Sequence, residues 1–324
     1  MNIVVVYPAA CLAAALTAAA SVPFWRRWCL KRGVMDDPGY RKIHSRPIPL
    51  AGGMAVMTGL LIPLVAGALA AVAASRSGVA GLFEYGLSVR AVQLLSLSAG
   101  ALGMLFIGLR DDKVELTPLV KFGGQLIVAL VVAASGMRIT LFVPSLLFSY
   151  AITALWILTV VNAFNFMDNM NGLCGGLGAI GAGWFGLIAA ESGQYLVATM
   201  AFLVMGALLG FLPYNFPRAT AFLGDAGSHL TGYLLAVLAI LPHFYTRQHP
   251  LPLAVLTPLL VLAVPLGDLV WVVLLRWKNG KPFYLGDTNH LSHRLVRRGF
   301  SQTRTVVLIW LLAGAAGALG FLLQ

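Results

Sequence analysis

The chain has 324 residues, of which 59% are hydrophobic and only 10% charged, and its formal net charge is +11. A mean hydropathy of +0.87 excludes a soluble globular domain, and long apolar runs without strict alternation exclude a transmembrane barrel. The basic excess does not indicate a nucleic-acid partner, because it follows the membrane topology described below. We therefore predict an all-α, polytopic membrane protein.

Ten apolar segments approach the roughly 20 residues that cross a bilayer as a helix. In chain order they are residues 3–24, 51–74, 91–109, 119–136, 140–161, 172–190, 194–214, 226–242, 251–267 and 304–322. We expect the first segment to be a retained anchor and not a cleaved signal peptide, because no Lys or Arg precedes it and Arg26 and Arg27 follow it. Without a repeat or a long polar stretch, residues 1–324 are expected to form a single transmembrane domain.

The basic residues are distributed unequally between the two sets of loops. Only four of the 22 Lys and Arg side chains fall in the loops after even-numbered spans, namely Arg76, Arg90, Arg138 and Arg247. Basic loops stay in the cytoplasm, so the loops after odd-numbered spans are expected inside and both termini outside the plasma membrane.

The acidic residues are also grouped. Eight of the 11 are aspartates: Asp36, Asp37, Asp111, Asp112, Asp168, Asp225, Asp268 and Asp287. Two predicted spans separate each of five successive positions, and an even number of spans returns the chain to the same face. A charged Asp at mid-bilayer costs about 2.5–3.5 kcal/mol, so these residues are expected at helix ends on the cytoplasmic face. Such a cluster suits Mg²⁺ shared with substrate phosphates, although any single Asp can instead cap a helix or pair with a cation.

Two motifs occur in the first half of the chain. Residues 41–47, which include Arg41 and His44, precede Gly52 and Gly53, and could place cations and a flexible approach beside a lipid phosphate. A purely topological basic loop explains them equally well. At the end of the third span, Asp111 and Asp112 offer carboxylates for a proton or a metal, and Lys113 offsets their repulsion.

Two further motifs flank the sixth and seventh spans. Residues 162–172 contain Asn162, Asn165 and Asp168 where a helix should meet water, which suits metal or phosphate binding, or else a turn with an N-cap. Asp225 lies between glycines at the start of the eighth span. A carboxylate and free backbone amides at a helix N-terminus favour a metal-bound phosphate.

The ninth span is expected to bend and to continue along the membrane surface. Pro258 and Pro265 make a bend possible, and residues 268–278 read as an amphipathic extension that ends in Arg276 and Lys278.

A histidine-bearing motif follows, with His290, His293 and Arg294 within residues 287–295. On a helix the two imidazoles share a face. No Cys or His-Glu-x-x-His pattern accompanies them, so binding of a diphosphate is favoured over binding of zinc.

Taken together, these segments resemble the polyprenyl-phosphate N-acetylhexosamine-1-phosphate transferases. The matching segments, in order, are residues 36–53, 108–113, 162–172, 224–228 and 287–295. In that family a polyprenyl phosphate attacks the β-phosphorus of a UDP-amino sugar in the presence of Mg²⁺, giving a sugar diphospholipid and UMP. The resemblance implies a multi-pass enzyme of the bacterial plasma membrane that begins a cell-envelope glycan with GlcNAc-1-phosphate on undecaprenyl phosphate, and it also implies a homodimer.

The resemblance further implies a role for individual residues. Mg²⁺ or Mn²⁺ would be held by Asp225, supported by Asn165. The catalytic carboxylates would be Asp111, Asp112 and Asp168. The substrates would be bound by Arg41, His44, Lys113, Asn162, His290, His293 and Arg294.

Two positions depart from the family pattern. Asn171 stands where relatives often carry Asp, and Ser292 replaces one His of a His-x-His-His-Arg run. These departures bear on metal affinity and on the choice of sugar.

Two other functions remain open from the residues alone. An ion-coupled transporter would carry its acids mid-span in broken helices, whereas these acids are predicted at helix ends. An intramembrane prenyltransferase needs two Asp-rich clusters, and only the pairs Asp36-Asp37 and Asp111-Asp112 are adjacent.

Overall fold

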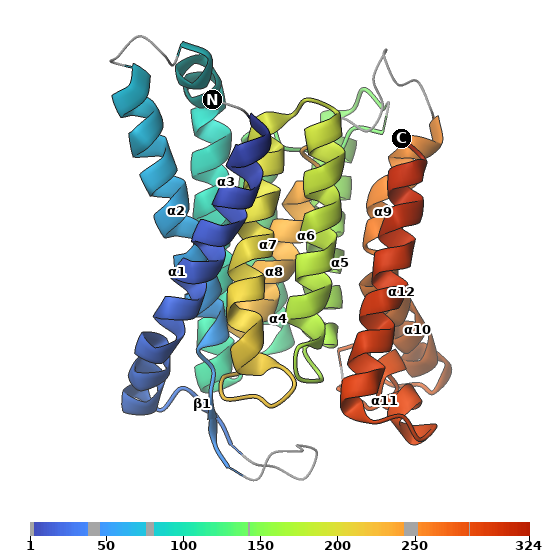
Figure 1. Ribbon diagram of the computed structural model, residues 1–324. Coiled ribbons are helices and arrows are strands. Elements are labelled where there is room, and N and C mark those ends of the chain that lie inside the picture. The colour runs from blue at the N-terminus through green and yellow to red at the C-terminus, as the bar shows by residue number, and fades with distance from the viewer. Residues whose placement is uncertain (1–2, 38–45, 76–80, 142, 243–251, 285) are drawn as a thin grey trace.

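The computed structural model describes residues 3–37, 46–75, 81–141, 143–242, 252–284 and 286–324. These residues are mostly helical and contain only two short strands, which confirms the all-α polytopic class (Figure 1). The helices are α1 (Ile3–Arg32), α2 (Gly52–Ser75), α3 (Gly81–Val114), α4 (Pro118–Ala134), α5 (Leu146–Met167), α6 (Leu173–Glu191), α7 (Tyr195–Asn215), α8 (Gly224–Leu238), α9 (Thr257–Val261), α10 (Ala263–Lys278), α11 (Leu291–Arg297) and α12 (Gln302–Leu322). A 3₁₀ turn, Pro252–Leu256, precedes α9, and strands β1 (Met35–Asp36) and β2 (Ile48–Pro49) pair antiparallel.

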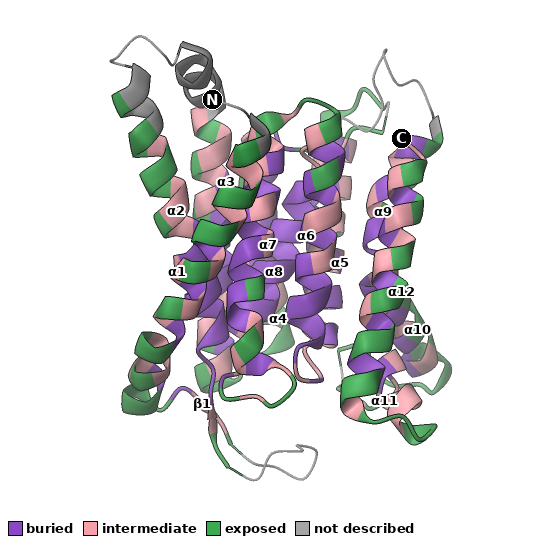
Figure 2. Ribbon diagram, viewed as in Figure 1, coloured by how far each residue is buried: buried purple, intermediate pink, exposed green. Residues whose placement is uncertain are grey.

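Helix α8 lies at the centre of the bundle, and every one of its residues except Asp225 is buried (Figure 2). It packs mainly against α3 and α5, with α2 and α6 completing the enclosure. Glycines make this close approach possible. A Cβ on Gly108 would lie 2.4 Å from Ala226 Cα, and a Cβ on Gly232 would lie 2.6 Å from Val161 Cα. The packing of α8 thus depends on backbone meeting backbone.

The long helices alternate in direction through the bundle (Figure 1). Helix α1 starts and α12 ends at the upper end of this view, while the α3–α4, α5–α6 and α7–α8 connections lie at the lower end. The motifs that the parity of the spans predicted on one face therefore do lie at one end of the molecule.

Among the described residues, seven helices are long and apolar enough to cross a membrane, or eight if a bent pair counts as one span. The bent pair is Leu253–Val261 with Ala263–Lys278, at 76°, which confirms the bend predicted near Pro258 and Pro265. Helices α4 and α8, with 17 and 15 residues, are shorter than a usual span. The chain is multi-pass, and the count of ten spans stays a prediction.

Several predicted loops are helical. Residues 162–167 are the last turns of α5, residues 25–32 extend α1, and residues 81–90 belong to α3. Polar side chains in these segments predict loops. In α5 the amides of Asn162 and Asn165 instead bond to neighbouring helices, and such tertiary contacts override local preference. The predicted helix over residues 268–278 is confirmed as the body of α10.

Candidate active site

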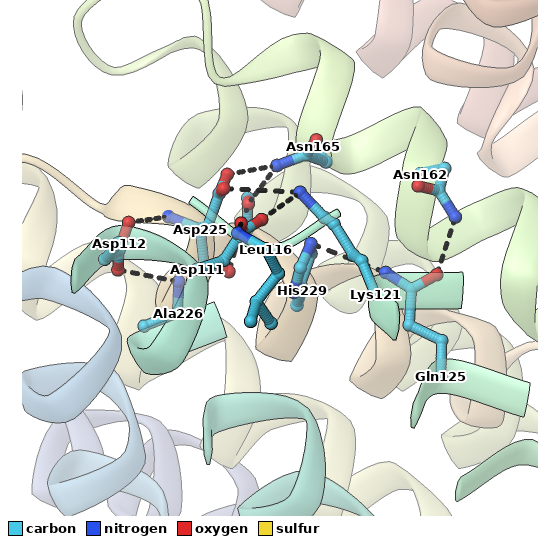
Figure 3. Close-up of polar contacts among 11 residues, drawn as sticks. Asp111, Asp112, Leu116, Lys121, Gln125, Asn162, Asn165, Asp225, Ala226 and His229 are labelled. Atoms are coloured by element: carbon cyan, nitrogen blue, oxygen red, sulfur yellow. Dashed lines mark hydrogen bonds and ion pairs between the residues drawn. The ribbon is translucent and has the colours of Figure 1, made fainter. Parts of the chain in front are cut away.

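Asp112 caps the N-terminus of α8 from the neighbouring helix α3 (Figure 3). Its Oδ1 accepts the N–H of Asp225 at 2.7 Å, and its Oδ2 accepts the N–H of Ala226 at 3.1 Å. The first amides of a helix have no partner within it, and a carboxylate both satisfies them and complements the helix dipole. Gly224 precedes them with φ +72°, and a Cβ there would lie 2.8 Å from Asp112 Oδ2. Asp112 therefore fixes the backbone that carries Asp225.

The Asp225 side chain is held by two groups. Its Oδ1 accepts a hydrogen bond from the side-chain amide of Asn165, with 2.5 Å between Nδ2 and Oδ1. Its Oδ2 lies 3.3 Å from Lys121 Nζ. The same Asn165 nitrogen lies 3.1 Å from Ser228 Oγ. Because a carboxylate only accepts, the amide nitrogen of Asn165, and not its oxygen, must face Asp225. Asn165 thus orients the carboxylate.

Asp111 completes this cluster. Its Oδ2 lies 2.6 Å from Lys121 Nζ, and its Oδ1 accepts the N–H of Leu116 at 2.7 Å. Lys121, near the start of α4, therefore bridges the carboxylates of Asp111 and Asp225 (Figure 3). The sequence analysis did not single out Lys121, although a Lys in the first turn of an apolar helix, ten residues after Asp111, is a usable signal.

A second polar chain reaches the cluster from α5. The Asn162 amide donates to Gln125 Oε1 at 2.9 Å and to the Leu158 carbonyl at 2.8 Å, and Gln125 Nε2 lies 3.5 Å from His229 Nε2. Ligand atoms of Asp111, Asp225 and His229 all lie within 4.8 Å of one another, close enough to share a metal ion. Two residues, Gln125 and His229, therefore lie between Asn162 and the carboxylates, and the sequence analysis missed both.

Asp168 follows directly on α5 as its C-cap and is partly exposed. Desolvation by the surrounding protein and the negative charges of Asp225 and Asp112 raise the pKa of Asp168 well above its ordinary value. A cation at this end of the molecule would offset both effects and favour the ionised carboxylate. Asn171, three residues further along the chain, contacts a different loop, because its side-chain amide donates to the Pro217 carbonyl at 3.2 Å.

The histidine-bearing segment is attached to this end through α10. Asp268 Oδ2 lies 2.7 Å from His290 Nδ1, and Asp268 Oδ1 accepts the N–H of Leu291 at 2.6 Å. The His290 ring meets the edge of Phe166, next to Asn165, at 5.5 Å between centroids. Ser292 Oγ donates to Asn169 Oδ1 at 2.7 Å. The segment therefore lies against the end of α5 that carries Asn165 and Asp168.

Ion pairs and burial set the charges in this segment. Burial opposes ionisation of Asp287, but the Asn289 N–H and Arg276, whose Nε lies 2.9 Å away, lower its pKa below the ordinary value. Burial, followed by the neighbouring His290 and Arg297, lowers the pKa of His293. His293 is accordingly a neutral ring at pH 7 that can donate or accept one hydrogen bond.

The remaining predicted site residues are more dispersed. Arg294 stacks on Trp271, with its guanidinium 4.7 Å from the ring centroid, and lines a groove of about 360 Å³ with residues of α10 and α12. Lys113 is exposed. Arg41 and His44 lie outside the described residues.

The flexible approach predicted at Gly52 and Gly53 is wrong. Both glycines are buried, and their N–H groups donate to the carbonyls of Phe222 and Leu223 at 2.9 and 3.1 Å. A Cβ on Gly53 would lie 2.5 Å from Gly227 N. These glycines serve close packing of α2 against the start of α8, which sequence alone cannot distinguish from a flexible loop.

Comparison with known proteins shows which proteins this chain resembles in sequence. Residues 94–243 match the family model described as Glycosyl transferase family 4. The chain is 32% identical to a probable undecaprenyl-phosphate N-acetylglucosaminyl 1-phosphate transferase of Bacillus subtilis, over 92% of this chain and 79% of that protein. It is 33% identical to a decaprenyl-phosphate N-acetylglucosaminephosphotransferase of Mycobacterium tuberculosis, over 93% and 78%. It is 28% identical to an undecaprenyl-phosphate alpha-N-acetylglucosaminyl 1-phosphate transferase of Escherichia coli, over 93% and 79%.

Proposed function

Because the chain belongs to glycosyl transferase family 4, with the polyprenyl-phosphate N-acetylglucosamine-1-phosphate transferases, we propose that it moves an N-acetylhexosamine-1-phosphate, GlcNAc-1-phosphate in the simplest case, from a UDP-sugar to undecaprenyl phosphate. An oxygen of the lipid phosphate forms a bond to the β-phosphorus. The bond from that phosphorus to the bridging oxygen breaks, and UMP leaves with the electron pair. The products are a lipid diphosphate that carries the sugar, and UMP.

The observation that supports this proposal is the convergence of Asp111, Asp225, Asn165 and Lys121 at the N-terminus of α8. Carboxylates from two helices suit Mg²⁺ or Mn²⁺, and a helix N-terminus with a lysine suits the phosphates that such a cation shares. The cation, when bound, would neutralise the charge that builds up between the two phosphorylated substrates. Asp225 and Asp111 are the residues that would hold it, and Asn165 keeps Asp225 in orientation.

In the proposed reaction, the positioning of charged groups contributes more to the rate than proton transfer does. The second pKa of a phosphate monoester is about 6, so the lipid phosphate is mostly ionised at neutral pH and needs no strong base. Asp111 is engaged with Lys121 and the Leu116 N–H, which fits the orientation of Lys121 toward a phosphate oxygen. Asp112 uses both oxygens to cap α8, so we assign it to positioning.

We assign the sugar nucleotide's diphosphate to the histidine-bearing segment. Asp268 holds His290 through Nδ1, which fixes the orientation of its ring. The neutral His293 can donate a hydrogen bond to a phosphate oxygen without adding charge. Arg294, Lys113, Arg41 and His44 remain proposed phosphate ligands, and Asp168 a proposed catalytic or metal-supporting carboxylate.

We also propose that this end of the molecule faces the cytoplasm of a bacterium and that both termini lie outside its plasma membrane, because basic residues are concentrated in the loops after odd-numbered spans. Both substrates fit that placement, since a nucleotide sugar meets a lipid headgroup at the inner surface. We also propose a homodimer. Neither a transporter nor a prenyltransferase accounts for the relatives that the chain matches.

A reconstituted transfer assay tests the function. The purified chain in lipid nanodiscs, given Mg²⁺, undecaprenyl phosphate and a panel of radiolabelled UDP-sugars, is expected to form a labelled lipid and an equal amount of UMP. Asp225→Asn should lower the rate by about 10³-fold, since it removes a carboxylate that no other group replaces. No labelled lipid from any sugar would refute the proposed reaction, and full activity of Asp225→Asn would refute the role of that residue.

A further inference from the structure

We propose that Gln125, Asn162 and His229 form a neutral hydrogen-bonded layer that holds the charged groups of the candidate active site in position. In this layer His229 is a positioning residue whose neutral imidazole carries its proton on Nδ1. This inference deepens the proposed function and rests on it for the reaction. Gln125 and His229 lie outside the segments that carry the family resemblance, so the resemblance assigns them no role.

The neutral layer and the charged groups are built from the same three helices. Each helix supplies one side chain to the charged groups and, three or four residues away, one side chain to the neutral layer. The pairs are Lys121 and Gln125 on α4, Asn165 and Asn162 on α5, and Asp225 and His229 on α8. Side chains at these separations share a face of the helix. A rotation that displaces a member of the neutral layer therefore displaces its charged neighbour.

The hydrogen bonds of the layer identify each polar atom. The side-chain nitrogen of Asn162 donates to the Leu158 carbonyl at 2.8 Å and to Gln125 Oε1 at 2.9 Å. The other end of the Gln125 amide, Nε2, then faces His229 Nε2 at 3.5 Å (Figure 3). An amide nitrogen only donates, so His229 Nε2 accepts, and the neutral imidazole must carry its proton on Nδ1. The chain of bonds therefore allows a single tautomer.

The neutral layer is more enclosed than the charged groups beside it. Gln125 and His229 have no exposed surface, whereas the side chains of Lys121 and Asp225 are 16% and 33% exposed. Ion pairs in contact with water are screened and hold their partners weakly, whereas hydrogen bonds away from water are stronger and directional. The buried layer therefore fixes the spacing of α4, α5 and α8 more firmly than the ion pairs do.

The positions of the charged groups depend on that spacing. Lys121 Nζ on α4 lies 2.6 Å from Asp111 Oδ2 on α3 and 3.3 Å from Asp225 Oδ2 on α8. From α5, Asn165 Nδ2 lies 2.5 Å from Asp225 Oδ1. When substrate phosphates compete for the Lys121 ammonium, these ion pairs loosen and the neutral layer keeps the helices in register. Catalysis by aligned charged groups needs such support from neighbouring hydrogen bonds.

An unpaired donor favours the positioning role over simple packing. His229 Nδ1 has no hydrogen-bond partner in the part of the chain that the structure describes. A Leu or Met side chain would fill a similar space without leaving a buried donor unpaired, so packing alone does not explain an imidazole. What the imidazole supplies, and an apolar side chain does not, is the acceptor for Gln125.

The same bonds exclude two other roles for these side chains. Although atoms of Asp111, Asp225 and His229 lie within 4.8 Å of one another, Gln125 already uses the free lone pair of the neutral imidazole. His229 therefore offers no ligand to a cation. The Asn162 nitrogen already makes two hydrogen bonds within the protein, so we assign it to positioning and not to the substrate.

Nuclear magnetic resonance tests the tautomer on the full chain in lipid nanodiscs. The six histidines are labelled with ¹³C and ¹⁵N, and the His229 signals are identified by their loss in His229→Gln. We expect a protonated Nδ1 and an unprotonated Nε2 in the wild-type protein. In Gln125→Met, which removes the donor, the form with the proton on Nε2 should appear. Wild-type protein with a proton on Nε2 overturns the inference, whether or not the variants fold.

The transfer assay tests the positioning role. His229→Leu and Gln125→Met should each lower kcat about 10- to 100-fold, with less than about twofold change in KM for the UDP-sugar, because a shift of about 1 Å in a catalytic group costs rate and leaves ground-state binding. The double variant should be no slower than the slower single variant, since both break the same bond. Thr231→Val, a buried substitution of similar volume on α8, is the control and should keep wild-type kcat.

His229→Gln separates positioning from bulk. Its side-chain oxygen can accept the Gln125 hydrogen bond, so kcat should return to within about threefold of the wild-type value. A kcat as low as that of His229→Leu would overturn the inference, as would wild-type kcat in a folded His229→Leu variant. If the wild-type protein shows the expected tautomer but forms no lipid product from any UDP-sugar, the proposed function is refuted and the hydrogen-bonded layer stays in place.

Discussion

The centre of the bundle and its C-terminal part are assembled in different ways. Around α8, the backbones of neighbouring helices are in direct contact. A side chain would not fit at the contact glycines, which include Gly53, Gly108 and Gly232. Helices α10 and α11 are instead attached by side-chain pairs, notably Asp268 with His290 and Ser292 with Asn169. Figure 2 shows the same contrast, with continuous burial over α8 and mixed burial over α10 to α12.

This difference indicates how each part meets its ligands. Close backbone contacts allow one arrangement, which suits a metal centre whose ligands must stay within a fraction of an ångström. Side-chain pairs are individually weak and can be exchanged, which suits a segment proposed to bind the diphosphate of a sugar nucleotide. Substitutions in the first region should therefore lower kcat, and those in the second should mainly change substrate binding.

Among the substitutions that test this comparison of the two regions, Gly108→Ala should have the largest effect, because it would disturb the packing of α3 against α8. The new methyl group would lie 2.4 Å from Ala226 and force α3 away from α8. Overpacking costs about 1–3 kcal/mol, and a shift of about 1 Å in a catalytic group can cost 10²-fold in rate. Thermal unfolding and the transfer rate measure the two effects. Gly123→Ala, where no atom lies within 4 Å, is the control, and equal activity of the two variants would contradict the close-packing argument.

Asp112→Asn tests whether the central region uses this carboxylate as a cap. The amide would place an N–H against an N–H of α8, at a cost of about 1–2 kcal/mol, and kcat should fall about 10- to 100-fold. A positioning role predicts that the residual rate keeps the wild-type pH profile. Disappearance of one limb of that profile would instead identify Asp112 as a group that transfers a proton.

Ser292→Ala should affect the second region alone. It removes the hydrogen bond to Asn169, worth about 1 kcal/mol, so KM for the UDP-sugar should rise about fivefold with little change in kcat. Asn169→Ala should have a similar effect, and the double variant should add nothing further. Additive effects of the two substitutions would show that the contact does not couple α11 to the α5–α6 loop.

The smallest effect is expected from Asp287→Asn, through the pH dependence of stability. The pKa of Asp287 is lower in the folded chain than its ordinary value, so the ionised group stabilises the fold above that value and loses its contribution as the pH falls through the folded pKa. The variant should be less stable by under about 1 kcal/mol near neutral pH, with the difference vanishing in acid. Unfolding midpoints compared at pH 7 and at a pH well below the ordinary pKa of Asp measure it, and a difference that stays constant down to complete protonation of Asp287 would exclude this residue as its source.

Residue pattern and topology predicted the meeting of Asp111, Asp112 and Asp225, because the parity of apolar segments counts faces correctly even where helix ends are misplaced. The local structure of Asn162 and Asn165 was mistaken, since polar residues in an apolar run resemble a loop until their partners on other helices are known. Which residues face one another across helices, such as Gln125 and His229, depends on helix rotation and packing, which a single sequence does not specify.

The shortness of α8 also has a consequence for where the two substrates meet. Its 15 residues extend about 22 Å, less than the roughly 30 Å of a hydrocarbon core. If α8 ends near the outer boundary of that core, Asp225 at its start lies below the level of the surrounding headgroups. Under that geometry a lipid phosphate and a water-soluble nucleotide would both have to pass below the headgroup level to reach Asp225.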